Sequence, residues 1–488
     1  MSDTDSQPEQ LYSAREPIFP RRVSGKFRNL KWVIMIVTLG IYYLMPWIRW
    51  DRGPNLPDQA VLVDLANRRF FFFWIEIWPH EFYFVAGLLI MAGLGLFLFT
   101  SALGRVWCGY TCPQTVWTDL YILVERWIEG DRNARLRLHR QEKMDARKLR
   151  LRVTKYASWL AIAVATGGAW VFYFTDAPTL LKDLVTFNAH PASYTSIAVL
   201  TFTTFVFGGF MREQVCIYMC PWPRIQGAMM DPDTLTVAYR DWRGEPRGKL
   251  KKGAPLAEAL LAGDCIDCMA CVNVCPMGID IREGQQLECI TCALCIDACN
   301  DVMDKIGKPR GLIGYLALSD EVRERDGKTP ISVWRHVFRV RTVLYTALWS
   351  AVGIGLVVAL FIRPDISATV HPVRNPMYVT LSDGTIRNNF DFGLRNKHGD
   401  DRRFRISLKG DPDMRLSIEG TPYESFIVPA NATGKQRVHV MAPKGSAAAN
   451  AERTAVRFWI EDLASGERVF KDSTFFGNGT KIDGAHGP

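Results

Sequence analysis

Eight of the twelve cysteines stand in two runs that share one internal spacing, C-x2-C-x2-C-x3-C. The first run comprises Cys265, Cys268, Cys271 and Cys275, and the second comprises Cys289, Cys292, Cys295 and Cys299. Thiolates at this spacing surround one face of an iron-sulfur cubane with three ligands, while the fourth cysteine reaches a neighbouring cubane. C-x2-C pairs also bind structural zinc, but eight cysteines in duplicated order favour two [4Fe-4S] clusters.

The crossing of the fourth cysteine, as in two-cluster bacterial ferredoxins, divides the eight thiols into two ligand sets. One cluster is assigned to Cys265, Cys268, Cys271 and Cys299, and the other to Cys289, Cys292, Cys295 and Cys275. Such thiolates must be kept reduced, so we expect this part of the chain on the cytoplasmic side of a membrane.

The remaining four cysteines form two C-x3-C-P motifs, CGYTCP with Cys108 and Cys112, and CIYMCP with Cys216 and Cys220. Proline tends to open a helix, which predicts Cys112 and Cys220 near helix N-caps, where amide groups favour a thiolate. These thiols could bind Cu(I), bind a further cluster or relay electrons through a reversible disulfide, and the motif alone does not separate the three. Met219 is the best nearby candidate for a thioether ligand, although packing is its plainer role.

Five apolar segments near the length of a membrane span are expected to position these motifs. The predicted spans are Leu30 to Ile48, Phe82 to Gly104, Tyr156 to Thr175, Tyr194 to Met211 and Leu344 to Ile362. Lys31 is their one charged residue, and it lies at an end, where its side chain can reach the head groups. Buried helices of a soluble protein are the alternative.

The net charge of +9 is distributed as the positive-inside rule requires rather than as a nucleic-acid footprint. Basic residues cluster before the first span and between the second and third, whereas the segment from Asp51 to Glu81 is nearly balanced. The N-terminus is therefore predicted in the cytoplasm and, after five spans, the C-terminus outside. No ionisable group lies in the middle of a span, which disfavours a proton or ion pump, and no span histidines are available for a haem.

From Asp365 onward, short alternating apolar runs separated by turn residues predict about eight strands. They are Met377 to Leu381, Asn389 to Leu394, Phe404 to Leu408, Leu416 to Ile418, Ser425 to Val428, Arg437 to Met441, Val456 to Ile460 and Val469 to Phe476. This spacing favours an all-β sandwich of immunoglobulin type, with a small β-barrel as the alternative. The segment has no cysteine and no evident catalytic group, so we expect it to dock a partner.

The predicted fold class is multi-domain: a helical membrane bundle of five spans, a two-cluster bacterial ferredoxin-like domain and a C-terminal immunoglobulin-like sandwich. The expected boundaries are a cytoplasmic tail at 1–29, a membrane region with four spans and both C-x3-C-P motifs at 30–230, the ferredoxin-like domain at 231–341, a fifth span at 342–363 and the sandwich at 364–488.

The whole layout resembles the cytochrome c oxidase accessory proteins called CcoG, FixG or RdxA. The resemblance rests on CGYTCP at 108–113, CIYMCP at 216–221, YRDWRGEPRG at 239–248, both cysteine runs and RNNFDFGLRNK at 387–397. It implies a role in assembling the cbb-type haem-copper oxidase by reducing Cu(II) to Cu(I), and an immunoglobulin-like C-terminal domain.

The leading hypothesis is therefore a cupric reductase of the bacterial cytoplasmic membrane, with Cys108, Cys112, Cys216 and Cys220 as the copper-reducing thiols. Expected partners are copper ions, oxidase subunits or their copper chaperones, a cytoplasmic electron donor or quinol, and no nucleic acid; a homo-oligomer is left open. A quinol-oxidising electron-transfer subunit for a periplasmic reductase is the second hypothesis. A non-enzymatic copper-handling assembly scaffold is the third.

Overall fold

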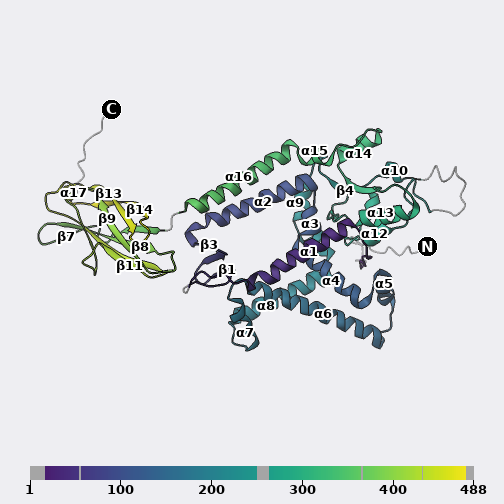
Figure 1. Ribbon diagram of the computed structural model, residues 1–488, viewed down its shortest axis with the longest axis horizontal. Coiled ribbons are helices and arrows are strands. Elements are labelled where there is room, and N and C mark those ends of the chain that lie inside the picture. The colour runs from purple at the N-terminus through teal and green to yellow at the C-terminus, as the bar shows by residue number, and fades with distance from the viewer. Residues whose placement is uncertain (1–16, 54–55, 250–262, 364–365, 431, 480–488) are drawn as a thin grey trace, which may run out of the picture. The chain divides into compact units, whose positions relative to one another are not determined.

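A computed structural model describes residues 17–53, 56–249, 263–363, 366–430 and 432–479 (Figure 1). It divides into two compact units, one with residues up to 48 and from 59 to 356, the other with residues 49–58 and from 357 onward. The predicted N-terminal tail comprises residues 1–29. Residues 1–16 lie outside the described residues, and residues 26–29 belong to the first helix.

Among the described residues, four helical segments are long and apolar enough to cross a membrane. These candidate spans are Lys26–Trp47, Tyr83–Leu103, Pro191–Met211 and Val340–Ile362, with 21 to 23 residues each. They correspond to helix α1 (Lys26–Leu44) with η1 (Met45–Trp47), α2 (Tyr83–Leu103), α8 (Pro191–Thr204) with the π-helix η3 (Phe205–Met211), and α16 (Val340–Ile362). At most 22% of each apolar window is buried inside the protein, so most of these surfaces are free to face lipid.

The third predicted span, Tyr156 to Thr175, falls on α6 (Ala146–Val171), which does not satisfy the same measure of length and apolarity. Its apolar part starts only after Lys155, and the helix ends at Val171 rather than continuing to Thr175. Alanine, glycine and threonine also make this stretch less apolar than the other four. The part of the chain that the structure describes therefore contains four clear candidate spans, where five were predicted.

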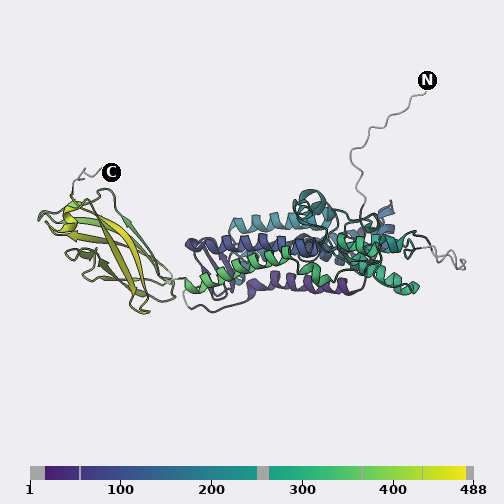
Figure 2. The ribbon, with the colours of Figure 1, turned by 90° about the horizontal axis from the view of Figure 1, so that it is seen from above.

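The long helices of this unit pack through small residues and aromatic rings. Helices α2 and α16 lie side by side, with the Trp349 indole donating to the Met91 carbonyl oxygen at 3.1 Å (Figure 1). Helix α6 packs against α8, where a Cβ on Gly167 would stand 2.9 Å from the Ile197 carbonyl oxygen. Glycine thus permits a close helix contact of the kind common in membranes. Figure 2 shows α1, α2 and α16 extending along one direction.

Short elements connect these helices. A three-stranded antiparallel sheet between α1 and α2 contains β1 (Val61–Asp64), β2 (Arg69–Phe72) and β3 (Ile75–Ile77), followed by η2 (Pro79–Glu81). The cysteine motifs are connected to α3 (Val106–Tyr110), α4 (Pro113–Glu129), η4 (Val215–Met219) and α9 (Trp222–Met229), and the remaining linkers contain α5 (Arg132–Arg140) and α7 (Ala177–Val185).

The two cysteine runs occupy a small α/β region within the first unit. Its elements are β4 (Thr236–Tyr239), α10 (Asp241–Gly244), α12 (Ala270–Val274), η5 (Ile281–Glu283), α13 (Leu294–Ile306) and β5 (Ile313–Leu316), followed by α14 (Leu318–Arg325) and α15 (Val333–Val337). Strands β4 and β5 pair antiparallel from Thr236 with Leu316 to Tyr239 with Ile313. The pairing joins the first and last parts of this region. Helices α12 and α13, which lie between β4 and β5 in the sequence, pack against each other.

The second unit is a β-sandwich. One sheet has the order β10-β12-β8-β6, with β7 beside β8, and the other has the order β11-β9-β13-β14. The strands are β6 (Ser367–Pro372), β7 (Val379–Thr380), β8 (Ile386–Arg395), β9 (Arg402–Lys409), β10 (Arg415–Ile418), β11 (Ser425–Val428), β12 (Thr433–Ala442), β13 (Arg453–Asp462) and β14 (Arg468–Phe476), with a short helix α17 (Ala447–Asn450). All eight predicted strands are present, and β6 was missed.

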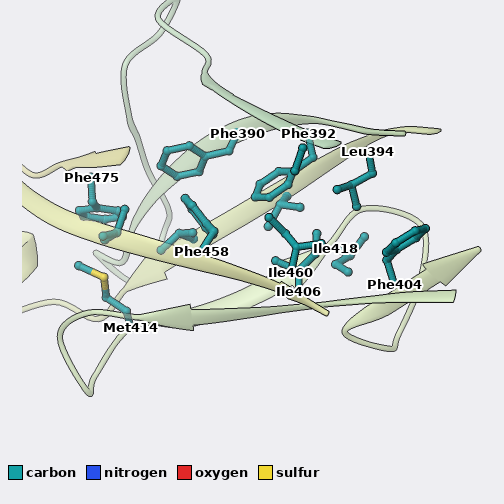
Figure 3. Packing of buried hydrophobic residues seen from close by; sticks show 14 of the residues in the cluster. Phe390, Phe392, Leu394, Phe404, Ile406, Met414, Ile418, Phe458, Ile460 and Phe475 are labelled. Atoms are coloured by element: carbon teal, nitrogen blue, oxygen red, sulfur yellow. The ribbon is translucent and has the colours of Figure 1, made fainter. Parts of the chain in front are cut away.

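Alternate side chains of the long strands fill the sandwich core, as a half-buried strand requires. Phe390 and Phe392 of β8 point at Phe458 of β13, whose ring centroid lies 4.9 and 5.1 Å from theirs (Figure 3). Two separate sheets packed on an apolar core agree with the sandwich prediction and not with a barrel.

Candidate iron-sulfur and thiol sites

The first cavity of the cysteine region is lined by Cys265, Cys268, Cys271 and Cys299, the four thiols assigned to one ligand set. Cys265 and Cys268 come from the loop entering α12, Cys271 lies in the first turn of α12, and Cys299 comes from α13. About 330 Å³ of space free of protein atoms lies between them and an apolar wall that includes Met303. Cys268 is exposed, whereas the other three thiols are buried, so this cavity has one edge near the surface.

The second cavity is lined by Cys289, Cys292, Cys295 and Cys275, with about 370 Å³ free of protein atoms. Cys275 ends α12, while the other three surround the start of α13. The last cysteine of each run thus lines the cavity formed by the first three of the other run. Cys271 also reaches the second cavity, so the two spaces are neighbours.

The loops of the two cysteine runs share a backbone conformation that the sequence pattern does not predict. Asp267 and Met269 have φ values of 52° and 57°, and Thr291 and Ala293, at the same positions of the second run, have 55° and 60°. Left-handed residues other than glycine are uncommon, and their repetition at equivalent positions points to a functional constraint. Successive amides in such turns form concave nests for anions, including the sulfur atoms of iron-sulfur sites.

Burial controls how readily these thiols ionise. It raises the pKa of Cys271 and Cys289 to about 11, and that of Cys275 and Cys299 to about 12. Neighbouring thiolates raise these pKa values further through like-charge repulsion. Four ionised sulfurs are therefore stable together only around a positively charged centre. Eight converging thiols, apolar walls and amide nests fit two [4Fe-4S] groups.

The motif YRDWRGEPRG has no evident role from the sequence. In the structure it forms hydrogen bonds and an ion pair with the start of the first cysteine loop. Arg243 pairs with Asp264 at 2.5 Å, and the Asp264 amide donates to the Arg243 carbonyl oxygen at 3.0 Å. The next amide, that of Cys265, donates to the Gly244 carbonyl oxygen at 3.3 Å. Arg243 also donates to the carbonyl oxygens of Pro309 and Arg310, so one side chain connects the start of the first loop to the segment after α13.

The C-x3-C-P motifs lie directly after two candidate spans. Cys108 belongs to α3, and Cys112 is the N-cap of α4 with proline at the first helical position, as predicted. Cys216 lies in η4, and Cys220 follows it. Cys220 lies near the N-cap of α9, as predicted, although the N-cap itself is Pro221.

The structure places all four of these thiols near enough to one another to interact electrostatically. The charges of Cys112, Cys108 and Cys220 each act on Cys216, whose pKa is raised to about 12, first by burial and then by these three neighbours. We call these four residues the thiol quartet. Sequence analysis did not predict this convergence, since it depends on how the preceding spans pack.

Arg105 is a positively charged side chain that lies close to the thiol quartet. Burial raises the pKa of Cys108, and the charge and hydrogen bond of Arg105 oppose that rise. The same guanidinium donates to the Leu287 carbonyl oxygen and lowers the pKa of Cys289. Arg105, itself 3% exposed, therefore connects the quartet electrostatically to the second cavity. Gln226 adds a polar contact, with its side-chain oxygen 3.1 Å from the Cys108 sulfur.

Residues inside CGYTCP hold the quartet against the second cysteine run. A Cβ on Gly109 would lie 2.6 Å from the Ile290 carbonyl oxygen and 3.0 Å from Cys292 Cα, so only glycine fits. The Tyr110 hydroxyl donates to the Cys292 carbonyl oxygen at 3.1 Å. Cys108 and Cys216 also pack on the apolar cluster that contains Cys292. The quartet is thus adjacent to the second cavity.

This arrangement, with apolar helices, paired cysteine cavities and a β-sandwich, defines an iron-sulfur electron-transfer protein. Family models agree: one described as "4Fe-4S dicluster domain" matches residues 211–317, and a "4Fe-4S binding domain" matches 84–131. A third, described as an "IG-like fold at C-terminal of FixG", matches 356–478.

Curated relatives place the chain within one family. It is 71% identical to Protein RdxB of Cereibacter sphaeroides over 98% of this chain and 100% of the relative, and 64% identical to Protein RdxA of that organism over 94% and 96%. It is 56% identical to the nitrogen fixation protein FixG of Rhizobium meliloti over 84% and 82%. The chain belongs to the FixG/RdxA family. A solved FixG-related protein from Vibrio parahaemolyticus matches 24% of this chain and 99% of its own length at 16% identity, with a TM-score of 0.21.

Gly109→Ala is expected to push α3 away from the second cysteine run. The added Cβ meets backbone rather than a flexible side chain, so the strain should cost about 1 to 3 kcal/mol. Iron and acid-labile sulfide per protein should fall, and the electron paramagnetic resonance signal of the reduced protein should change. Gly93→Ala is the control, because nothing lies within 4 Å of its added Cβ. Unchanged cluster content and spectrum in Gly109→Ala would contradict the contact.

Arg105→Gln is expected to raise the pKa of Cys108, because a positive charge that stabilises its thiolate is lost. The thiolate fraction at a given pH then falls, and the midpoint of the alkylation rate against pH should rise by about one unit. Mass spectrometry of the peptide containing Cys108 measures this midpoint. Arg105→Lys keeps the charge and should shift it less. Equal midpoints for all three proteins would show that Arg105 does not act on Cys108.

Proposed function

We propose that this protein is a membrane-bound cupric reductase that supplies Cu(I) for assembly of a cbb-type haem-copper cytochrome c oxidase. The observation that carries the proposal is the convergence of the thiol quartet directly beside the second cysteine cavity. Cys265, Cys268, Cys271 and Cys299 would hold one [4Fe-4S] cluster, and Cys289, Cys292, Cys295 and Cys275 the other. Once bound, each cluster supplies one electron at a time.

The quartet would bind copper as the substrate and favour its reduced state. Cys108, Cys112, Cys216 and Cys220 present soft thiolate ligands, which stabilise Cu(I) relative to Cu(II). The reaction is Cu(II) plus one electron to Cu(I), and it needs no proton. Arg105 keeps Cys108 closer to its ionised form, and burial limits competing water. Gly109 and Tyr110 fix the short separation that electron transfer from the second cavity requires.

The five-span topology is also part of the proposal, with α6 as the third span. Near its N-terminal end, Lys155 pairs with Glu129 of α4 at 3.0 Å, on the basic side of the protein. Just beyond its C-terminal end, the Tyr173 carbonyl oxygen accepts from the Val63 amide of β1 at 2.8 Å. Strand β1 belongs to the connection between α1 and α2, so α6 runs from the side of α4 to the side of β1 and would cross the membrane.

This topology places the tail at 1–29 and the ferredoxin-like domain at 231–341 in the cytoplasm of a bacterium, with the membrane region at 30–230 and the span at 342–363 in its inner membrane. The sandwich at 364–488 would then be periplasmic, where it could dock oxidase subunits or their copper chaperones. Electrons would come from a cytoplasmic donor or from quinol.

A phosphatase fusion at the C-terminus distinguishes five spans from four. If α6 crosses the membrane, the C-terminus is periplasmic and alkaline phosphatase fused there should be active, because it folds only in an oxidising compartment. If only the four clear candidate spans cross, the C-terminus is cytoplasmic and the fusion should be inactive. A fusion after Arg140, predicted cytoplasmic in both cases, is the matched control.

Copper reduction is tested with protein purified without oxygen, reduced and freed of reductant. Cu(II) is added with a Cu(I)-specific chromophore, and Cu(I) should appear in proportion to cluster oxidation. Cys216→Ser should lower the initial rate at least about tenfold while cluster content stays the same, since a soft thiolate ligand is lost. Tyr218→Phe, at an exposed position of the same motif, should leave the rate unchanged.

Clusters that stay reduced beside Cu(II) would refute the reductase proposal. Oxidation of quinol by the same protein would then favour the quinol-oxidising subunit, and redox-inactive clusters with bound copper would favour the assembly scaffold. Loss of the clusters in Cys216→Ser would assign the quartet to folding or cluster insertion.

A further inference from the structure

A pocket outside the iron-sulfur site opens between the start of α1 and the C-terminal half of α4. It encloses about 860 Å³ of space free of protein atoms, part of it open to solvent. Its lining combines three arginines, one carboxylate and two indoles, namely Arg22, Arg28, Arg126, Asp131, Trp32 and Trp127. We call it the basic pocket.

Positive charge in the basic pocket exceeds negative charge. Arg28 is already committed to the buried carboxylate of Asp119, with nitrogen-oxygen distances of 2.9 Å. Asp131 accepts the backbone amide of Arg22 at 3.0 Å and lies 4.0 Å from Nε of Arg126. One lining carboxylate therefore faces three guanidinium groups, of which Arg28 alone has its charge closely paired.

The Arg126 guanidinium has a hydrogen-bond donor that lacks an acceptor among the described residues. Its side chain is 14% exposed, and Nη2 donates to the carbonyl oxygens of Pro20 and Arg21. Its Nε is buried without a hydrogen-bond partner among the described residues. Burial and the charges of Arg135 and Arg28 lower its pKa to about 10, while Asp119 and Asp131 oppose that shift, so an additional anion would further stabilise the charged form.

The surroundings of the pocket resemble a membrane interface. Trp127 is 76% exposed, and the Trp32 ring lies 3.9 Å from the Arg28 guanidinium. The candidate span that contains α1 begins at Lys26 and exposes Leu30 and Val33 next to the pocket. Tryptophan is enriched at the head-group level of membranes, and basic pockets near spans bind lipid head groups.

We propose that the basic pocket binds a phosphate group, and that its source is the head group of an anionic phospholipid. Arg22 and Arg126 donate hydrogen bonds to the phosphate oxygens, and Trp127 covers the adjoining glycerol and upper acyl region. Arginine suits this role because its planar guanidinium binds phosphate through two parallel hydrogen bonds. The lipid would thereby be held between α1 and α4, independently of copper chemistry.

The test uses the full chain with its clusters, purified in detergent and titrated with phosphatidylglycerol while tryptophan fluorescence is recorded. A saturable change is expected that phosphatidylcholine does not produce and that Trp127→Phe lacks. Arg126→Gln should weaken the apparent affinity about tenfold, as loss of a charged hydrogen bond does. Arg22→Gln should weaken it as well, and because Arg22 is exposed this variant decides the outcome if Arg126→Gln loses its clusters.

Arg150→Gln is the matched control, because it removes the same charge from an exposed site on α6. Its affinity should stay within about twofold of the unchanged protein, since an isolated surface charge contributes little. Equal weakening by Arg150→Gln and Arg22→Gln would indicate attraction to the whole basic surface and overturn the pocket. Absence of saturation would overturn it too. Equal saturation by inorganic phosphate, lost in Arg22→Gln, would keep the phosphate site and overturn the lipid as its source.

Discussion

The contact on which the functional arrangement depends is the one between α3 and the second cysteine run. Gly109 has no side chain, so its backbone approaches Ile290 and Cys292 directly, and the Tyr110 hydroxyl donates to the Cys292 carbonyl oxygen. Without this contact the quartet would remain four thiols near a membrane surface and would not lie beside the second cavity. Arg105 adds to the contact by acting on thiols of both groups.

A network of buried charges holds the helices that carry the quartet. Glu125 of α4 accepts from Arg135 at 2.9 Å and from Arg212 at 3.0 Å, and Lys155 of α6 lies 3.5 Å from it. Buried ion pairs contribute little net stability, but a misplaced partner leaves an uncompensated charge and is strongly unfavourable. The network therefore selects one packing of α4, α5, α6 and the end of η3, which is the packing that brings the second C-x3-C-P motif to the first.

Local patterns in the sequence predicted the local parts of the structure. Alternation located eight strands, but β6 was missed because Ser367–Pro372 has little apolar alternation. The two ligand sets assigned from cysteine spacing each line one cavity. Arg135 and Lys155 are buried in spite of their charge, since their partners lie on α4. Convergence of the quartet was equally unpredictable, because helix packing is set by contacts between distant residues.

The exchange of the fourth cysteine between cavities also has a consequence for biosynthesis. Chain order makes the cavity containing Cys275 complete once residue 295 has been added, whereas the cavity beginning with Cys265 waits for Cys299. Neither cavity can form from one cysteine run alone, so the ribosome must pass into the second run before either site has all its ligands. Both sites have all their ligands once residue 299 of 488 has been added, and the site beside the thiol quartet becomes available first.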